Sequence, residues 1–215
     1  MGKLFGTDGI RGIAGKNLTA ELAFHVGQAM AVVLQEELGR KPVITIGKDT
    51  RISSDMLEAA LSAGICSVGG DVLLLGTIPT PAVAFLTIRE KADAGVVISA
   101  SHNPYEHNGI KVFNAQGYKL PDAMENRVEE LILSHAEMPV KTGGAIGCCR
   151  NASEEMHEDY IDYLLGTVGC DLSGLRVLVD CANGAAAATA PDLFQRLPVM
   201  ADFINIDPDG VNINR

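Results

Sequence analysis

The sequence lacks tryptophan, is poor in other aromatic residues, and contains no long basic run. Aromatic residues make up 5% of the 215 residues, and the formal net charge is −10. The missing basic run argues against nucleic acid or an anionic membrane as the main partner. The sequence also lacks an apolar signal region and any apolar stretch long enough to cross a bilayer, so we expect a cytoplasmic protein.

Cysteine is present, but not in the patterns of a disulfide framework or a metal site. The number is odd, and no two cysteines form a C-x-x-C pair. We therefore expect reduced thiols, as in a cytosolic protein. The five cysteines are Cys66, Cys148, Cys149, Cys170 and Cys181.

Apolar residues are abundant, at 47% against 20% charged residues. A sizeable core can form, which argues against global disorder. The length suffices for one large domain or two ordinary ones.

Short apolar runs alternate with stretches of helical periodicity, which predicts an α/β protein with layered sheets. We expect strands at 43–46, 72–75, 94–98, 110–113, 176–179 and 203–206. We expect helices from Thr19 to Gly39, from Ser53 or Ser54 to Gly69, near 83–87, from Pro121 to about 132, at 153–165, and in an alanine-rich stretch ending near 197.

A glycine-containing stretch from 139 to 152 predicts a linker between two domains. The first domain would comprise residues 1–138 and the second residues 153–215. The second would hold only two strands and two helices, which leaves sheet edges unpaired. We therefore expect the first domain to be complete and the second to be truncated.

The stretch Ala94 to Pro104 is the strongest candidate for a functional site. Its apolar part predicts a buried strand, which ends in the small polar residues Ser99, Ser101, His102 and Asn103. Pro104 prevents the strand from continuing. A serine is thus presented at the carboxyl end of a core strand, where open α/β sheets bind ligands. An ordinary polar turn is the alternative.

Two further segments carry glycine and charge. Residues 5–16 are rich in glycine, which indicates tight turns or close approach to a ligand; the segment is not a Walker loop. Residues 47–51 predict a charged turn after a strand. An anionic substrate would need local positive charge, for which the candidates are Arg11, Lys48, Arg51 and Lys111.

Together these three segments resemble the α-D-phosphohexomutase superfamily. The matching motifs are GTDGIRG at 6–12, GKDTR at 47–51, and the serine loop followed by NGIK at 108–111. The opening MGKLF and the segment PDGVNIN at 208–214 are most similar to the bacterial phosphoglucosamine mutase branch. The resemblance covers the whole chain.

The resemblance implies layered α/β domains with mixed sheets, of the phosphohexomutase type. It also implies a four-domain enzyme that interconverts glucosamine 6-phosphate and glucosamine 1-phosphate, for UDP-N-acetylglucosamine synthesis. It implies a hexosamine phosphate substrate, a hexose 1,6-bisphosphate as intermediate and activator, and it leaves a homodimer open. Ser101 would be the phosphoserine, and its phosphate would bind Mg²⁺. A covalent phosphoenzyme divides the transfer between two distant hydroxyls into two similar steps.

By the same resemblance, Arg11 and Lys111 lie near the reacting centre. Lys111 is the better candidate for proton transfer, and Arg11 for an electrostatic clamp because arginine does not deprotonate. His102 is assigned a phosphate-binding or loop-fixing role. Adjacent residues of an extended segment point in opposite directions, so a direct Ser101–His102 couple is not expected. Residues 49–51 would brace the serine loop.

Several family motifs are absent from these 215 residues. The D-G-D-G-D-R loop, which supplies three aspartates to the metal, does not occur, nor do the sugar loop and the R-x-S-G-T phosphate loop. His107 stands where many relatives have aspartate. We therefore expect this chain alone to have no mutase turnover.

Three alternatives remain open. A phosphoglucomutase or phosphomannomutase would differ in sugar-reading residues that this chain lacks. A non-catalytic sugar-phosphate-binding module would keep the fold without the reaction. A serine hydrolase is poorly supported, because no G-x-S-x-G motif occurs and the choice of His135 or His157 as partner would be arbitrary.

Overall fold

The computed structural model describes residues 4–6 and 9–215, in which strands and helices alternate along the chain. The strands are β1 (Ile10–Ile13), β2 (Val43–Lys48), β3 (Asp71–Thr77), β4 (Ala94–Ile98), β5 (His107–Asn114), β6 (Cys149–Asn151), β7 (Arg176–Asp180) and β8 (Met200–Ile204). The α-helices are α1 (Ala20–Leu38), α2 (Ile52–Ser67), α3 (Thr80–Arg89), α4 (Asp122–Leu133), α5 (Ser153–Gly166) and α6 (Ala190–Gln195).

Six of the strands form one mixed sheet in the order β1-β5-β4-β2-β3-β6. The inner strands β4, β2 and β3 and the edge strand β6 run parallel, whereas β5 is antiparallel to both β4 and β1. The expected α/β class with a mixed sheet is confirmed.

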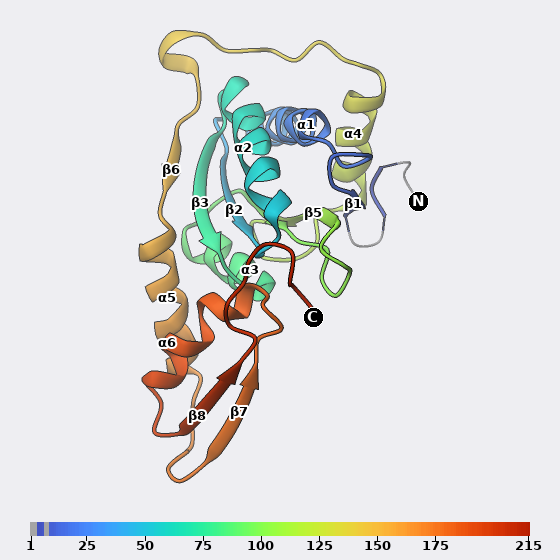
Figure 1. Ribbon diagram of the computed structural model, residues 1–215. Coiled ribbons are helices and arrows are strands. Elements are labelled where there is room, and N and C mark those ends of the chain that lie inside the picture. Colours follow the sequence, from blue (N-terminus) through green and yellow to red (C-terminus); the bar gives the residue numbers. More distant parts are fainter. Residues whose placement is uncertain (1–3, 7–8) are drawn as a thin grey trace.

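Helices cover both faces of this sheet (Figure 1). On one face α1, α2 and α4 pack against the sheet through Val26, Leu57 and Val128, which are almost completely buried. On the other face, α3 and α5 cover the sheet through Leu86 and Met156. Because β4 is buried by helices on both faces, its sequence is continuously apolar rather than alternating.

The ends of α1 follow the signals in the sequence. The Thr19 hydroxyl accepts a hydrogen bond from the Leu22 amide at 3.1 Å, which caps the first turn. Gly39 ends the helix with φ +65°, a conformation that glycine adopts without the steric cost of a Cβ.

Helices α1 and α2 cross unusually closely, because each contributes a glycine to the contact. A Cβ at Gly27 would lie 2.3 Å from the Leu61 carbonyl oxygen, and one at Gly64 would lie 2.1 Å from that of Phe24. Only a residue without a side chain fits at these two positions.

Several predicted boundaries were wrong. Strand β2 continues through Gly47 and Lys48, so the charged turn is confined to 49–51. The alanine-rich stretch is not one helix: a 3-10 turn at Ala185–Ala188 precedes α6, whose first turn contains Pro191. Proline cannot donate the hydrogen bond that a continuing helix would require there. Strand β8 begins at Met200, three residues before the prediction.

The expected linker at 139–152 contains a strand of the large sheet. Strand β6 pairs in parallel with β3, and Cys149 is opposite Val72. Helix α5, expected in the second domain, buries Met156 and Tyr160 in the same apolar cluster as α3 and β3. The large sheet and its cover therefore extend beyond residue 138, and the division into domains at that point stays a prediction.

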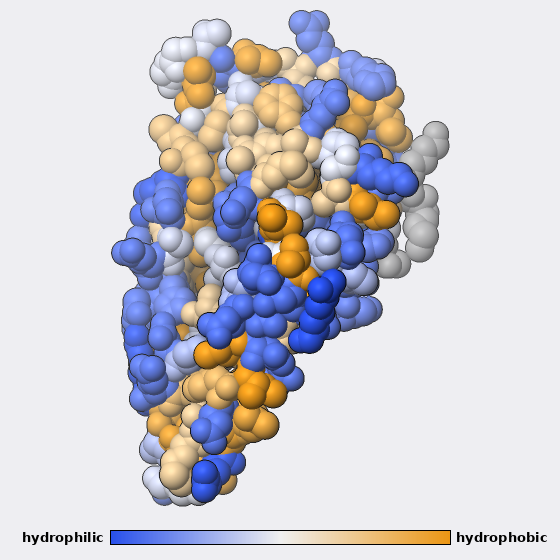
Figure 2. Space-filling model, in the orientation of Figure 1, coloured by the Kyte–Doolittle hydropathy of each residue, from blue (hydrophilic) through white to orange (hydrophobic). Residues whose placement is uncertain are grey.

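Strands β7 and β8 form a separate two-stranded parallel sheet beside α6. Apolar side chains are exposed on it, with Leu178 at 67% and Met200 at 55% exposure. Figure 2 shows apolar surface in this lower part of the molecule, among hydrophilic side chains. Within the described ranges, no helix is both long and apolar enough to span a membrane.

Candidate active site around Ser101

Ser101 lies on an exposed turn three residues beyond the end of β4. Ser99 and Ala100 are still buried, whereas Ser101 and His102 are exposed. Ser101 has φ +57°, and the Asn103 amide donates to the Ala100 carbonyl at 3.2 Å, which closes a tight turn. A left-handed conformation at a non-glycine residue costs about 1 to 3 kcal/mol and persists only where its surroundings enforce it.

The buried guanidinium of Arg51 braces this turn. Its Nη2 donates to the carbonyl oxygens of Ser101 at 3.0 Å and Asn103 at 2.7 Å, while Nη1 pairs with the Asp49 carboxylate. The Arg51 side chain has no exposed surface, and that of Asp49 is 5% exposed. The expected bracing of the serine loop by residues 49–51 is thus present, and Arg51 points at the loop backbone.

A second hydrogen-bond network holds Asp49, the partner of Arg51. The fully buried Asn108 donates through Nδ2 to the hydroxyls of Ser53 at 2.9 Å and Ser54 at 3.1 Å. The Ser54 hydroxyl in turn donates to Asp49 at 3.0 Å. Asp49 therefore accepts bonds that fix its orientation toward Arg51, so β2, α2 and β5 together determine the loop geometry.

Arg11 and Lys111 lie on adjacent strands and on the same face of the sheet. Arg11 on β1 is opposite Gly109 on β5, and Lys111 follows two residues later. Side chains at such diagonal positions of an antiparallel pair lie about 7 to 8 Å apart at their bases. A Cβ at Gly109 would lie 3.2 Å from the Arg11 Cγ, so the glycine allows the arginine side chain to lie across β5.

Two of the four basic residues that are candidates for binding an anion form ion pairs within the protein. Lys48 pairs with Asp55 at 2.8 Å and with Glu58. Burial acts to lower the pKa of Lys48, but hydrogen bonds to these two carboxylates outweigh it and raise the pKa. Burial raises the pKa of Glu58. Lys48 and Arg51 are thus held in internal ion pairs. Binding of an anionic substrate by Arg11 and Lys111 stays a prediction.

A hollow of about 300 Å³ adjoins Lys111. Its lining includes Gly9, Thr80, Phe113 and Lys119. Gly9 has φ +81°, and a Cβ there would lie 2.3 Å from the Ile110 carbonyl oxygen, so the glycine-rich segment closely approaches β5. Of this segment, Thr7 and Asp8 lie outside the described residues.

His102 is exposed, and no hydrogen bond joins it to another residue of the described ranges 4–6 and 9–215. The turn at 101–102 is not extended, so the alternation of side chains assumed for the Ser101–His102 pair does not apply there. His107 is half-buried at the start of β5, opposite Ile13.

Magnesium would need more oxygen ligands than this part of the chain offers. In the described segments, no group of three or more histidine, cysteine, aspartate or glutamate side chains is arranged to hold a metal. The Ser101 hydroxyl alone does not form a Mg²⁺ site, which takes near-octahedral oxygen coordination. The residues present therefore do not fit a complete metal centre.

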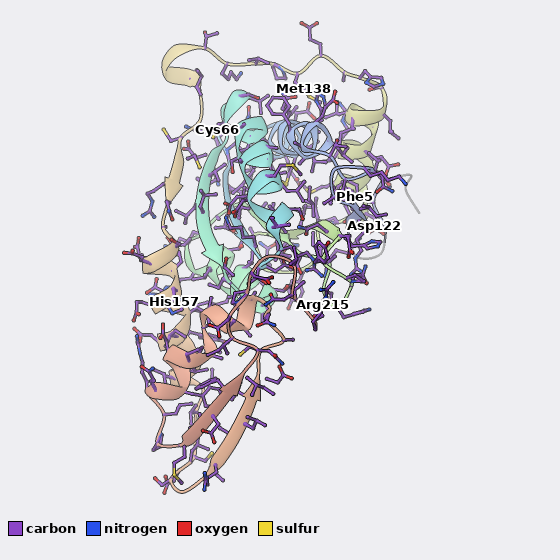
Figure 3. All side chains as sticks on the ribbon, viewed as in Figure 1. Phe5, Cys66, Asp122, Met138, His157 and Arg215 are labelled. Carbon is purple, nitrogen blue, oxygen red and sulfur yellow. The ribbon has the colours of Figure 1, made fainter. Side chains whose placement is uncertain are left out.

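Sequence reasoning missed Asn214, whose amide nitrogen donates to the same two carbonyls as Arg51, at 3.1 Å to Ser101 and 3.3 Å to Asn103. The neighbouring Arg215 guanidinium lies 5.5 Å from the centroid of the Tyr105 ring. Figure 3 labels Arg215 beside the serine loop. The asparagines of the segment 208–214 indicate side chains that can form hydrogen bonds. Their spacing does not indicate that Asn214 binds a carbonyl 113 residues earlier in the chain.

The chain resembles known proteins over its full length. It is 55% identical to a phosphoglucosamine mutase of Clostridium acetobutylicum over 215 residues, all of this chain and 48% of that protein. Against a phosphoglucosamine mutase of Caldanaerobacter subterraneus it is 57% identical over 197 residues, which cover 92% of this chain and 44% of that one. The chain thus spans about half the length of the curated relatives it matches.

Solved structures and a family model agree with this relationship. A phosphoglucomutase/phosphomannomutase family protein from Burkholderia thailandensis superposes with a TM-score of 0.83 at 26% identity, covering 99% of this chain and 45% of that one. Residues 2–138 match the model described as phosphoglucomutase/phosphomannomutase, alpha/beta/alpha domain I. The chain therefore belongs to the phosphoglucomutase/phosphomannomutase family.

Proposed function

We propose that this chain is the N-terminal part of a phosphoglucosamine mutase. The full-length protein would interconvert glucosamine 6-phosphate and glucosamine 1-phosphate through a phosphoserine at position 101. Relatives that carry this name, at 55% and 57% identity, support the proposal. The substrate would be a hexosamine phosphate, a hexose 1,6-bisphosphate would be both intermediate and activator, and the cytoplasm would be the site of action. A homodimer is compatible with it.

The observation that carries the proposal is the placement of Ser101. Its side chain is exposed on a turn whose backbone carbonyls are held by a fully buried arginine. A nucleophile that must first accept and then donate a phosphoryl group needs a fixed backbone and an accessible oxygen. An ordinary solvent-exposed turn has no need of a buried ion pair beneath it.

The roles of the neighbouring residues follow from their chemistry. Arg11 would hold the oxygens of the transferring phosphoryl group, because its charge is permanent. Lys111 would move the proton of the attacking or leaving sugar hydroxyl, and His102 would bind phosphate or fix the loop. Mg²⁺, when held by the Ser101 phosphate and by ligands outside this chain, would neutralise charge on the transferring group.

Intact-mass measurement tests the assignment of Ser101. The full-length protein, incubated with Mg²⁺ and glucosamine 1,6-bisphosphate, is expected to gain the mass of one phosphoryl group. Ser101→Ala should abolish this gain, whereas Ser134→Ala, which removes an exposed hydroxyl at the end of α4, should not. Absence of any adduct on the unmodified full-length protein would refute the proposal and favour a non-catalytic sugar-phosphate-binding module.

Assays with three substrates separate the enzymatic alternatives. Turnover of glucosamine phosphate well above that of glucose and mannose phosphates supports the phosphoglucosamine mutase. The reverse preference would identify a phosphoglucomutase or phosphomannomutase. The 215 residues alone are expected to show no turnover with any of the three, and appreciable product from them would contradict the need for further domains.

A further inference from the structure

The segment from 205 to 214 returns from β8 and lies against the first half of the chain (Figure 1). The Ile52 amide donates to the Gly210 carbonyl at 2.9 Å. Gly210 has φ +90°, and a Cβ there would lie 3.0 Å from the Ile52 Cβ. The Thr50 hydroxyl donates to the Asn183 carbonyl at 2.5 Å. Two separate contacts thus join the region around β7 and β8 to Thr50 and to Ile52, the first residue of α2.

Asn214, near the end of this segment, bonds directly to the serine loop. Its Nδ2 is 3.1 Å from the Ser101 carbonyl oxygen and 3.3 Å from that of Asn103. Both partners are backbone acceptors, so the side-chain amide must present its nitrogen to them rather than its oxygen. The same two carbonyls accept from Arg51 at 3.0 and 2.7 Å. The turn that carries Ser101 is therefore held by two donors that lie far apart in the sequence.

The position of Asn214 is fixed by the loop that follows β7. Its backbone amide donates to the Ala182 carbonyl at 2.8 Å. Ala182 and Asn183 both have positive φ, at 49° and 50°, and the Asn183 side chain donates to the Asn212 carbonyl at 3.3 Å. Any shift of the β7–β8 unit against the large sheet would therefore move the Asn214 amide relative to Ser101.

We infer that Asn214 is a positioning residue for Ser101, which couples the orientation of the serine to the placement of the β7–β8 unit. It acts on the carbonyls of Ser101 and Asn103 and not on the Ser101 hydroxyl. The hydrogen bonds from Arg51 do not depend on where the β7–β8 unit lies. Those from Asn214 form only when this unit is in place. The inference deepens the proposed function, on which its kinetic consequence rests.

Hydrogen exchange tests the structural part without reference to catalysis. Two variants of the 215-residue chain are compared. Asn214→Leu has a side chain of similar size without the Nδ2 donor. Asn214→Asp places a carboxylate, which only accepts, against the carbonyls of Ser101 and Asn103. Both are expected to speed exchange of the loop amides of Ser101, Asn103 and His107 at least 10-fold, with exchange in β2 and β4 unchanged. Asn126→Leu, at an exposed position on α4, is the matched control and should leave the loop unaffected.

Two results would overturn the inference. Loop exchange in both Asn214 variants equal to that of the unmodified chain would show that Arg51 suffices. A general increase of exchange across the large sheet, with a lowered melting temperature, would show that Asn214 is only a stabilising residue.

The kinetic part uses the full-length protein. With a hexose 1,6-bisphosphate and Mg²⁺, Asn214→Leu is expected to lower the rate constant of Ser101 phosphorylation about 10-fold, because a misplaced nucleophile loses its alignment. The bisphosphate concentration at half-maximal rate should not change. An unchanged rate constant contradicts the coupling. If the unmodified protein takes up no phosphate, the proposed function fails, and hydrogen exchange still decides the structural role of Asn214.

Discussion

At the level of single residues, Arg51 is a fully buried charge beneath the serine loop. Its side chain has no exposed surface, its charge is balanced by Asp49, and its Nη2 donates to two carbonyls of the serine loop. A buried ion pair adds little net stability over an apolar pair, but removal of one partner leaves the other charge buried and alone. The residue is therefore essential to the loop even though the pair itself contributes little.

Arg51→Met is expected to lower the free energy of unfolding by about 3 to 5 kcal/mol, because Asp49 then stays buried without a counter-charge. Arg51→Lys should recover only part of this, since one ammonium cannot reach Asp49 and both carbonyls in the same geometry. Urea denaturation of the purified variants measures the effect.

The exposed pair of Arg89 and Asp159, joined at 2.7 Å, provides the control. Arg89→Met should lower the free energy of unfolding far less than Arg51→Met does, because solvent screens a surface pair. Equal losses for the two arginine variants would contradict the special role of Arg51.

At the level of elements, the contact between α1 and α2 depends on two glycines. Gly64→Ala is expected to destabilise the protein by about 3 kcal/mol or more, because the added methyl group would overlap the Phe24 carbonyl and force the helices apart. Gly166→Ala, in the last turn of α5 with open space around it, should instead stabilise by about 0.5 kcal/mol. Thermal unfolding followed by circular dichroism distinguishes the two signs.

Elements with strong local signals could be predicted, and those set by distant partners could not. The boundaries of β4 matched the prediction because five consecutive apolar residues end at a polar turn. The linker prediction included β6 because glycines lie close before it and Cys149–Asn151 has no apolar pattern. Only pairing with β3 makes these residues a strand. Pairing between segments that lie 77 residues apart leaves no mark in local composition.

The candidate site shows the same division. The exposed turn at Ser101 and the bracing by residues 49–51 follow from motifs that are continuous in the chain. That the Arg51 side chain turns inward, to the backbone of the loop, depends on the buried Asp49 and Ser54 and could not be read from its charge. The role of Asn108 could not be predicted either, because an asparagine before a glycine is typical of a turn, and its partners Ser53 and Ser54 lie more than 50 residues away.

At the level of the whole molecule, the large sheet needs residues beyond 138 to cover it. Strand β6 and the buried side chains Met156 and Tyr160 complete the face that α3 begins. A chain of residues 1–166 is therefore expected to keep the sheet folded, whereas a chain of residues 1–138 should expose this face. Burial of two large side chains contributes about 3 to 6 kcal/mol, so the melting temperature of 1–138 should be lower by roughly 10 °C or more.

Melting curves and binding of a hydrophobic dye to the two chains provide the measurement. Equal melting temperatures, with equally low dye binding, would support a domain boundary at 138 and contradict the structural argument for including α5.

The two supports of the serine loop also imply an order of events during folding. The loop joins neighbouring antiparallel strands, so β4 and β5 can meet through a short closure, and the Arg51 contact spans only 50 residues. The Asn214 contact spans 113 residues and must wait until β7 and β8 have emerged from the ribosome. A refolding chain is likewise expected to form the turn at Ser101 first and to make the longer-range Asn214 contact later, an order that pulsed hydrogen exchange would resolve.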